Sequence, residues 1–214
     1  NKLQAPNQIK DDKGLNMTYL PVNIDNPILI SFFDRLHGIF ADMDRQYAEA
    51  AKHYGFHCSG CEDNCCRTRF RHHTLMEYAY LQRGFAGLEF GLRREIRTRS
   101  GDYLQALQDA EAADKKFRHW CPLNFDGRCR LYTFRPMICR LHGIPHRMLI
   151  PGRPERLGPG CVEFDRQCAG PCSGALDRTP HYQRMADLEL RLRRELGISE
   201  RIRMTVAEMI RKVG

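Results

Sequence analysis

The sequence has no long hydrophobic run and only one tryptophan among its 214 residues. No segment approaches the roughly 18 apolar residues that a membrane-spanning helix needs. The first stretch, from Asn1 to Leu20, is polar and lacks the apolar core of a signal peptide. The chain also has no phosphate-binding glycine loop and no dinucleotide-binding fingerprint. We therefore expect a cytoplasmic protein with no membrane partner.

Cysteine, in contrast, is abundant, with ten residues in the chain. Ten cysteines could form a disulfide scaffold, but such scaffolds are usually secreted and shorter than about 80 residues. In a reducing cytoplasm, cysteines persist as thiols or as metal-bound thiolates instead. The cysteine content therefore favours metal binding over disulfides.

The chain is basic, with a formal net charge of +8 and an isoelectric point near 9.1. Basic proteins often bind nucleic acid or other anionic surfaces. Metal-bound cysteines are thiolates, however, so about eight of them around about two divalent ions would lower the net charge to about +4. The charge is therefore weak support for nucleic acid, which stays an alternative through basic helix faces. The sequence identifies no protein partner.

Hydrophobic spacing predicts a mainly α-helical fold. From Pro27, apolar side chains recur every three or four residues as far as Tyr47, which is typical of a long amphipathic helix, here ending near Gly55. Further helices are expected over 75–83, over 92–117 with a potential break at 100–101, from 179 to 196, and after 205.

Two of these helices carry their own start signals. Thr74 with Glu77, and Thr205 with Glu208, have the spacing of capping boxes. Thr179 followed by proline resembles an N-cap with proline in the first helical position. We divide the chain into an N-terminal arm, residues 1–26, and a single helical domain, residues 27–214, which includes a metal-binding region over 55–172.

Residues 121–172 differ from the helical remainder because proline and glycine interrupt short segments that are rich in cysteine. Asp126-Gly127 between two short apolar stretches predicts a β-hairpin. Pro136 suits the first turn of a short helix that runs towards Arg140, and residues 151–160 are expected to form a loop. The expected fold is thus a helical domain with a small irregular or hairpin cysteine-rich insert, stapled to it by metal.

The first candidate metal ligands lie within nine residues. They are Cys58, Cys61, Cys65 and Cys66. Spacings of two and three residues bring sulfur atoms around one point where the chain turns tightly. Adjacent side chains diverge in most backbone conformations, so we expect Cys65 and Cys66 to serve different metals, or one of them to pack instead.

The second set of candidate ligands lies more than fifty residues further on. It comprises Cys121, Cys129, Cys139 and Cys161. A zinc site normally takes ligands from two separated segments, so this set can complete sites that the first motif begins. Weaker candidates are Cys168, Cys172 and His142.

Taken together, the motifs resemble a known family. They are Cys58-x-x-Cys61-x-x-x-Cys65-Cys66, Cys121-Pro122-Leu123, Gly127-x-Cys129-x-Leu131-Tyr132 and Arg135-Pro136-x-x-Cys139-Arg140. This pattern is similar to the YkgJ-type cysteine-cluster family, described as zinc- or iron-chelating proteins. The resemblance covers roughly residues 55–145 and is weaker up to Cys161. Flagellin lysine N-methylases carry a similar cysteine cluster, which adds methyl transfer as a distant alternative.

Spacing does not decide between two kinds of metal centre. A closed tetrahedral zinc site would be structural, whereas an iron–sulfur cluster would make the protein redox-active. We favour zinc slightly and keep the iron–sulfur cluster as a close alternative. The leading function is metal binding with a structural or metal-handling role. The alternatives are an iron–sulfur redox or methyl-transfer enzyme, and a zinc-organised adaptor for nucleic acid or protein.

No catalytic residue can be assigned from the sequence, and whether the protein is an enzyme stays open. His142 and His146 near Cys139 can serve as ligands, general bases or partners of ligands. Arg135 and Arg140 are expected to neutralise thiolates or, alternatively, to contact an anion. His72-His73 is expected to be a surface pair. The arginines at 93, 94, 97 and 99 are expected on a solvated helix face.

Overall fold

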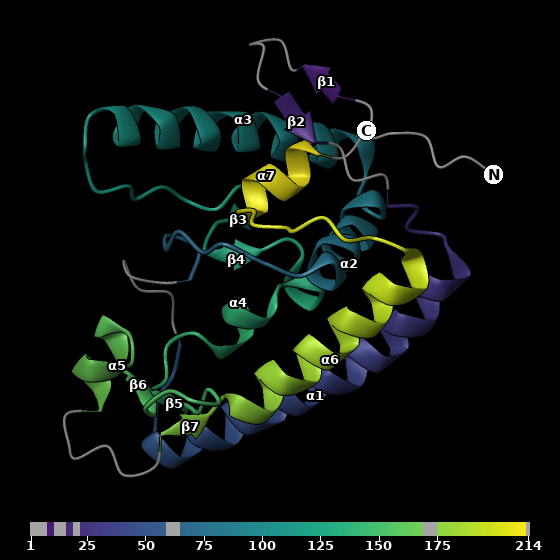
Figure 1. The fold of residues 1–214 in the computed structure, drawn as a ribbon. Helices are drawn as coiled ribbons and strands as arrows, with labels where there is room; N and C mark the ends of the chain where they lie inside the picture. Colours follow the sequence, from purple (N-terminus) through teal and green to yellow (C-terminus); the bar gives the residue numbers. More distant parts are fainter. Residues whose placement is uncertain (1–7, 11–15, 19–21, 59–64, 169–174, 213–214) are drawn as a thin grey trace.

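The computed structural model describes residues 8–10, 16–18, 22–58, 65–168 and 175–212. The predicted mainly α-helical class is confirmed (Figure 1). The described ranges contain seven α-helices: α1 (Pro27–Tyr54), α2 (Leu75–Ala86), α3 (Phe90–Ala112), α4 (Met137–Leu141), α5 (Val162–Gln167), α6 (Thr179–Leu196) and α7 (Val206–Arg211).

The long first helix, α1, begins and ends where the sequence predicts. The side chain of Asn26 accepts a hydrogen bond from the Ile28 backbone N–H at 2.9 Å, and Pro27 occupies the first turn. Gly55 ends the helix in the left-handed region at φ 64°. Helix α6 runs alongside α1 over most of its length (Figure 1). These two helices form one wall of the molecule.

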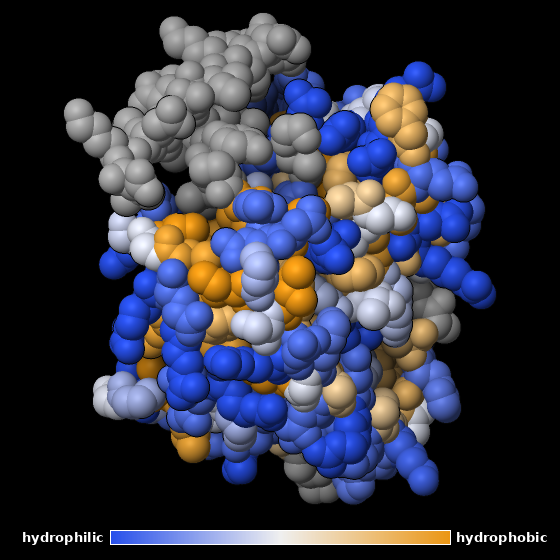
Figure 2. All heavy atoms as spheres, turned by 90° about the vertical axis from the view of Figure 1, so that its right-hand side faces the viewer, coloured by the Kyte–Doolittle hydropathy of each residue, from blue (hydrophilic) through white to orange (hydrophobic). Residues whose placement is uncertain are grey.

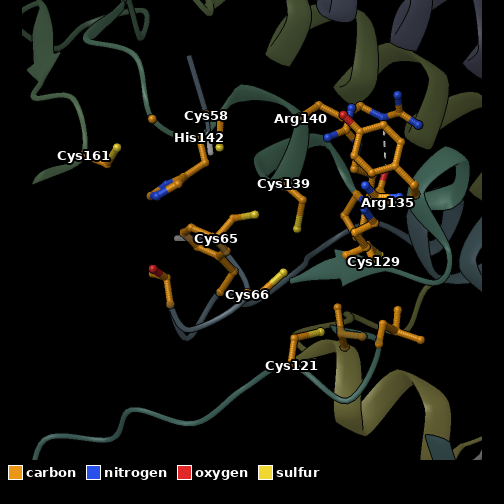
Figure 3. A pocket seen from close by; sticks show the side chains of 18 of the residues that line it. Cys58, Cys65, Cys66, Cys121, Cys129, Arg135, Cys139, Arg140, His142 and Cys161 are labelled. Atoms are coloured by element: carbon orange, nitrogen blue, oxygen red, sulfur yellow. Dashed lines mark hydrogen bonds between the residues drawn. The ribbon is translucent and has the colours of Figure 1, made fainter. Parts of the chain in front are cut away.

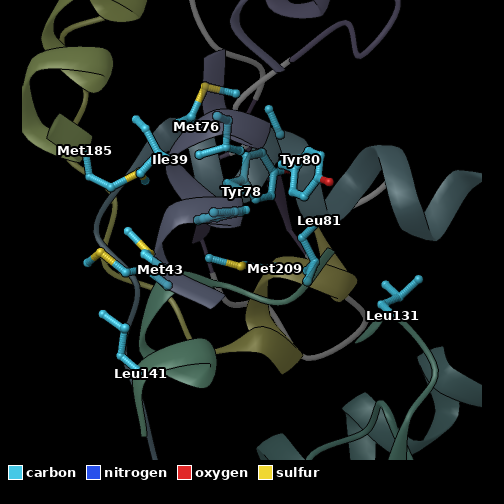
Figure 4. Close-up of a cluster of buried hydrophobic side chains, with 14 of the residues drawn as sticks. Ile39, Met43, Met76, Tyr78, Tyr80, Leu81, Leu131, Leu141, Met185 and Met209 are labelled. Carbon is cyan, nitrogen blue, oxygen red and sulfur yellow. The ribbon is translucent and has the colours of Figure 1, made fainter. Parts of the chain in front are cut away.

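The hydrophobic core lies between that wall and α2 (Figure 4). Almost every residue of α2 is buried, and Leu75, Met76, Leu81 and Phe85 have no exposed surface. A helix that is covered on all sides has no amphipathic stripe, which is why its length was underestimated at 75–83. Its N-terminus is held by Glu189 of α6, whose carboxylate accepts from the N–H groups of Leu75 at 2.7 Å and Met76 at 3.0 Å.

Helices α3 and α7 pack against each other on the far side of the core. The capping box of α7 is confirmed, with Thr205 and Glu208 bonding each other's backbone N–H groups. The potential break in α3 is not present: Gly101 lies inside the helix, and the Ser100 hydroxyl donates to the Ile96 carbonyl at 2.8 Å. The helix ends at Ala112, five residues before the predicted end.

The cysteine-rich stretch contains more regular structure than expected. The predicted hairpin is confirmed as β3 (Asn124–Phe125) and β4 (Arg128–Cys129), with Asp126 and Gly127 both at positive φ. A 3₁₀ turn (Tyr132–Phe134) and the predicted short helix, α4, follow.

A small sheet beyond α4 was missed. Strand β5 (His146–Met148) lies between β6 (Arg156–Gly158), which is antiparallel to it, and β7 (Leu176–Asp177), which is parallel. Part of the expected 151–160 loop is therefore a strand. The three residues of β6 are too few to show an apolar period, and the strand is defined by its pairing with β5. The short helix α5 was missed for a similar reason: Phe164, on the docked face, packs against Tyr54 and Phe56.

The start of α6 differs in detail from the prediction. Thr179 is the first helical residue, not the N-cap, which is Arg178. The Thr179 hydroxyl instead accepts a hydrogen bond from the Leu149 backbone N–H at 2.8 Å, and Asp177 accepts from the Thr179 N–H at 2.9 Å. The threonine thus connects α6 to the chain that follows β5.

In the N-terminal arm, β1 (Gln8–Lys10) pairs with β2 (Asn16–Thr18) in antiparallel fashion. Among the helices described, none is both long enough and apolar enough to cross a membrane. On the face in Figure 2, hydrophilic side chains predominate and apolar ones emerge between them in separate areas. The division into an arm and one helical domain stays a prediction.

Candidate metal centre

Seven cysteines from four separate segments line one cavity of about 910 Å³ (Figure 3). We call it the cysteine cavity, and its cysteines are Cys58, Cys65, Cys66, Cys121, Cys129, Cys139 and Cys161. All belong to the two predicted ligand sets. The structure therefore brings together the first motif, the hairpin, α4 and the start of α5, as the sequence predicts.

Backbone hydrogen bonds hold these segments beside one another. The Cys121 N–H donates to the Cys66 carbonyl at 2.6 Å, which joins the two cysteine sets directly. The Cys161 N–H donates to the Gly143 carbonyl at 2.9 Å, just after α4. On the outer side, the Gln167 side chain binds both backbone groups of His57, next to Cys58. Main-chain hydrogen bonds, together with the Gln167 side chain, thus hold the cysteine-bearing segments around the cavity.

The adjacent cysteines do not diverge as predicted. The Cys65 thiol is hydrogen-bonded to Cys66, so both sulfurs lie together. This contact, together with the Asn124 amide and the Arg135 guanidinium, lowers the pKa of Cys66 to about 6. The same contact, with burial, raises the pKa of Cys65 well above its usual range. The pair therefore consists of one acidic thiol and one that holds its proton.

The hairpin cysteines are surrounded by backbone donors. The Leu123 N–H donates to Cys121, and the Leu131 N–H donates to Cys129, in each case two residues after the cysteine. Burial nevertheless dominates, because it raises the pKa of Cys129 to about 11 and that of Cys121 even further. Burial also raises the pKa of Cys139 on α4. These thiols favour the protonated form until a positive partner is near.

Arg135 and Arg140 were both expected to neutralise thiolates or to contact an anion, but their contacts in the structure differ. Arg135 lowers the pKa values of Cys66 and Cys129, so it supplies positive charge to the thiols. Arg140 turns towards α1, where it pairs with Asp44 at 2.5 Å and lies over the Phe40 ring at 4.0 Å. Arg140 is thus a structural bridge between α4 and α1.

His142 lies on the wall of the cysteine cavity, beside Cys161 and Cys65 (Figure 3). Its ring meets the edge of Phe70 at a centroid distance of 5.4 Å. Its carbonyl accepts a hydrogen bond from the Tyr47 hydroxyl at 2.9 Å. The position is compatible with a ligand role and is fixed by α1.

Three predicted ligands are not among the described residues that line the cavity. Cys61 and Cys172 lie outside the described residues. Cys168 does not line the cysteine cavity, and its sulfur donates to the Tyr54 carbonyl at 3.3 Å. Cys168 therefore packs against the end of α1.

Within the described residues, no three cysteine, histidine, aspartate or glutamate side chains converge closely enough to hold a metal ion. The described cysteines of this cavity share the space without forming a coordination sphere. Their residual exposure is to this cavity, since Cys121, Cys129 and Cys139 are only partly exposed and lie along its walls.

Sequence reasoning missed two polar residues that organise the cavity. Asn124 is buried, and its Oδ1 accepts from the Gly127 N–H at 3.2 Å while its amide acts on Cys66. Glu77 of α2 is also buried and accepts from the Met137 N–H at 2.8 Å, at the start of α4. The Asn-x-Asp-Gly turn is a sequence signal for Asn124, but nothing in the sequence pairs Glu77 with α4.

Two expectations about basic side chains need correction. His72 is buried and forms a β-bridge with Met204, so only His73 of the expected surface pair is exposed. The arginine run on α3 is not freely solvated, because Arg97 lies over the Phe85 ring at 5.5 Å and Arg99 over the Phe125 ring at 4.1 Å. Part of this run packs against the protein itself.

Comparison with known proteins adds no identification, since no protein-family model, no curated protein and no solved structure matches the chain.

Proposed function

We propose that the protein binds metal through the thiolates of the cysteine cavity, in a structural or metal-handling role. The observation that carries this proposal is the gathering of seven cysteines from distant segments around one cavity. A buried free cysteine ordinarily acts as a small hydrophobe. Seven of them line one cavity, although Cys161 also belongs to the hydrophobic core, and so many thiols around one space support metal binding over packing alone.

The surroundings of the thiols fit a metal centre. Backbone N–H groups donate to Cys121 and Cys129, and Arg135 adds positive charge, so negative sulfur is accommodated on this side. Soft thiolate donors suit zinc and iron–sulfur clusters. The described thiols must still draw closer to bind one ion, and Cys61 of the first motif is expected to join them.

Zinc is the first candidate, because closed thiolate sites are a common use of cysteines from separated segments. The iron–sulfur cluster stays a close alternative: seven sulfurs line the cavity, which exceeds the four of a closed zinc site and equally the four of one cluster, so their number does not separate the two. Bound zinc would stabilise the fold, and a bound cluster would supply one-electron chemistry.

The resemblance to the YkgJ-type cysteine-cluster family supports the same proposal, since the described cysteines that carry it line the cavity. A redox or methyl-transfer enzyme remains the second candidate, favoured by a volume of about 910 Å³, which leaves room for an organic substrate. The adaptor alternative loses support from the packed arginines of α3. A reducing cytoplasm is the compartment in which these thiols would persist.

Metal analysis combined with an absorption spectrum of anaerobically purified protein tests the proposal. A colourless protein with stoichiometric zinc identifies the first candidate, and a brown protein containing iron and sulfide identifies the second. Folded, carefully reduced protein without either metal contradicts the proposal.

Serine variants locate the site. We expect Cys66→Ser and Cys121→Ser to lose most of the metal, because both sulfurs face the cysteine cavity. Cys168→Ser is the matched control and should retain the metal, since its sulfur lies outside the cavity against Tyr54. Equal metal content in all three variants would place the ligands elsewhere.

A further inference from the structure

A second cavity, of about 260 Å³, adjoins the cysteine cavity. The two share the wall formed by Phe70, His142, Gly143 and Cys161. The side chains of Arg156, Arg178, His146 and Tyr182 line the remainder together with apolar residues and glycine. Among the described lining residues there is no aspartate or glutamate, so basic side chains have no negative counterpart in the wall.

Arg178 is the most unusual of these residues. It lies between β7 and α6, and only 5% of its surface is exposed. Its guanidinium donates to the Leu141 carbonyl and bonds the Tyr182 hydroxyl, both neutral groups. Its Nε is buried without a hydrogen-bond partner among the described residues. A buried guanidinium with no carboxylate beside it is costly unless an anion completes its environment.

The carboxylate of Asp177 does not compensate the buried charge of Arg178. Asp177 precedes Arg178 in the chain, but its carboxylate pairs with Arg147 at 3.2 Å and accepts from the Thr179 N–H. Among the described residues, no carboxylate forms an ion pair with Arg178. The positive charge of Arg178 therefore faces the smaller cavity without compensation.

Arg156 adds to this positive environment from the small sheet, and the neutral ring of His146 lies beside it. The His146 ring lies directly against Gly158, where a Cβ atom would approach the ring to 2.1 Å. Glycine at this position thus lets β6 cover the histidine closely. Burial, followed by Arg178 and Arg156, lowers the pKa of His146 to about 4. The two arginines act on the same enclosed space.

We propose that this smaller cavity is an anion site, in which Arg178, with His146 and Arg156, receives the phosphate or carboxylate group of a small molecule. Arginine matches both groups because its planar N–H donors form paired hydrogen bonds with their oxygens. The volume suits such a group, being below the range of about 300–1,000 Å³ that is typical of whole drug-sized ligands.

The shared wall places the anion site next to the proposed metal centre. His142 and Cys161 stand between a molecule anchored at Arg178 and the other thiols, so a molecule long enough to pass them would meet the proposed metal centre. The contact of the bound molecule with the metal centre rests on the proposed metal function, whereas anion binding at Arg178 does not. The ligand class is accordingly a small acid or phosphate ester.

Calorimetric titration of the purified 214-residue chain with sodium phosphate, and separately with sodium malonate, tests the proposal at constant ionic strength. We expect saturable binding of at least one of them, and the tighter of the two identifies the preferred group. Arg178→Met should weaken binding about tenfold or more, because a charge-assisted hydrogen bond is lost. Arg153→Met is the matched control, since it removes the same charge from the exposed 151–155 segment outside the cavity.

Arg156→Met provides a second measure that does not depend on changing a buried residue. This exposed arginine lines the cavity, so its loss should weaken anion binding severalfold without unfolding the protein. Metal content, measured on the same samples, should be unchanged, which separates failure of the anion site from failure of the metal proposal. Absence of saturable binding by the wild type, or equal affinities in all variants, overturns the anion site.

Discussion

His181, on α6, is fully buried, and neither ring nitrogen has a hydrogen-bond partner among the described residues. Burial is the main cause that lowers its pKa, helped by Arg184, while the charges of Asp42 and Asp177 oppose the shift. The folded protein therefore holds this imidazole neutral. It lies away from both cavities, so it can be studied without disturbing the thiols.

This histidine predicts a pH dependence of stability. Its pKa is lower in the folded protein than the value of about 6.5 in the unfolded chain, so the unfolded chain binds the proton more readily. The contribution of His181 to the free energy of unfolding is present above pH ~6.5. It is lost as the pH falls from there towards the pKa of this histidine in the folded protein. We expect His181→Leu to reduce the decline in unfolding free energy between pH 7 and pH 5, as measured by urea denaturation at several pH values.

A control distinguishes this histidine from the others. His53 lies exposed near the end of α1, and His53→Gln should leave the pH profile of the wild type unchanged. His72 is also buried with a lowered pKa, so part of the decline should persist in the His181 variant. Identical profiles for His181→Leu and the wild type would contradict the prediction.

At the scale of elements, Glu77 connects α2 to α4. One carboxylate oxygen accepts from the Thr74 hydroxyl at 2.6 Å and the other from the Met137 N–H at 2.8 Å. Helix α4 has no side-chain cap of its own, so this carboxylate satisfies its N-terminus. The helix that carries Cys139 and Arg140 is thus positioned from the hydrophobic core.

Replacing Glu77 with glutamine should weaken this connection. The amide has one acceptor instead of two, and its NH₂ group faces a donor, so we expect a loss of about 1–3 kcal/mol in unfolding free energy. Metal content should fall as well, because α4 positions Cys139. Glu95→Gln, on the exposed side of α3, is the control and should change neither. Wild-type stability of Glu77→Gln would show that the carboxylate is dispensable.

The elements that the sequence predicted well are those with local signals. Helix α1 has a clear apolar period and is bounded by Asn26-Pro27 and Gly55, and the hairpin turn at Asp126-Gly127 needs positive φ values that these residues tolerate. The strands β5, β6 and β7 have two or three residues each, and their pairing depends on partners far along the chain. Local pattern therefore could not reveal them.

The candidate site was predicted in its residue types but not in its arrangement. Cysteine spacing identified the thiols, because few other patterns place four cysteines in nine residues. The contact between Cys65 and Cys66 depends on the local turn, which spacing does not specify. Arg178 is one of 34 basic residues, and only the junction of β7 and α6 shows that it is buried without a carboxylate. A buried charge can be recognised only in three dimensions.

At the scale of the whole molecule, the described residues combine two kinds of structure. The α1–α2–α6 body has a continuous apolar core, including Phe32, Leu36, Leu81 and Leu192. The segments around the cysteine cavity consist of two-residue strands, a 3₁₀ turn and helices of five and six residues. Such short elements bury little apolar surface of their own, so their order depends on core contacts, such as those of Leu131 and Leu141, and on cross-links to the body.

If metal provides those cross-links, its removal should loosen one part of the molecule and spare the other. We expect chelation under reducing conditions to speed amide hydrogen exchange in residues 65–72 and 121–141, measured by mass spectrometry, while peptides from α1 and α6 remain protected. Cys121→Ser should show the faster exchange before any chelator is added. Since Glu77 and the Cys121–Cys66 backbone bond persist without metal, these segments should stay partly protected instead of unfolding completely. Unchanged exchange in 121–141 after the metal has left would mean that the hydrogen bonds alone hold the cavity together, and that the metal serves chemistry instead of structure.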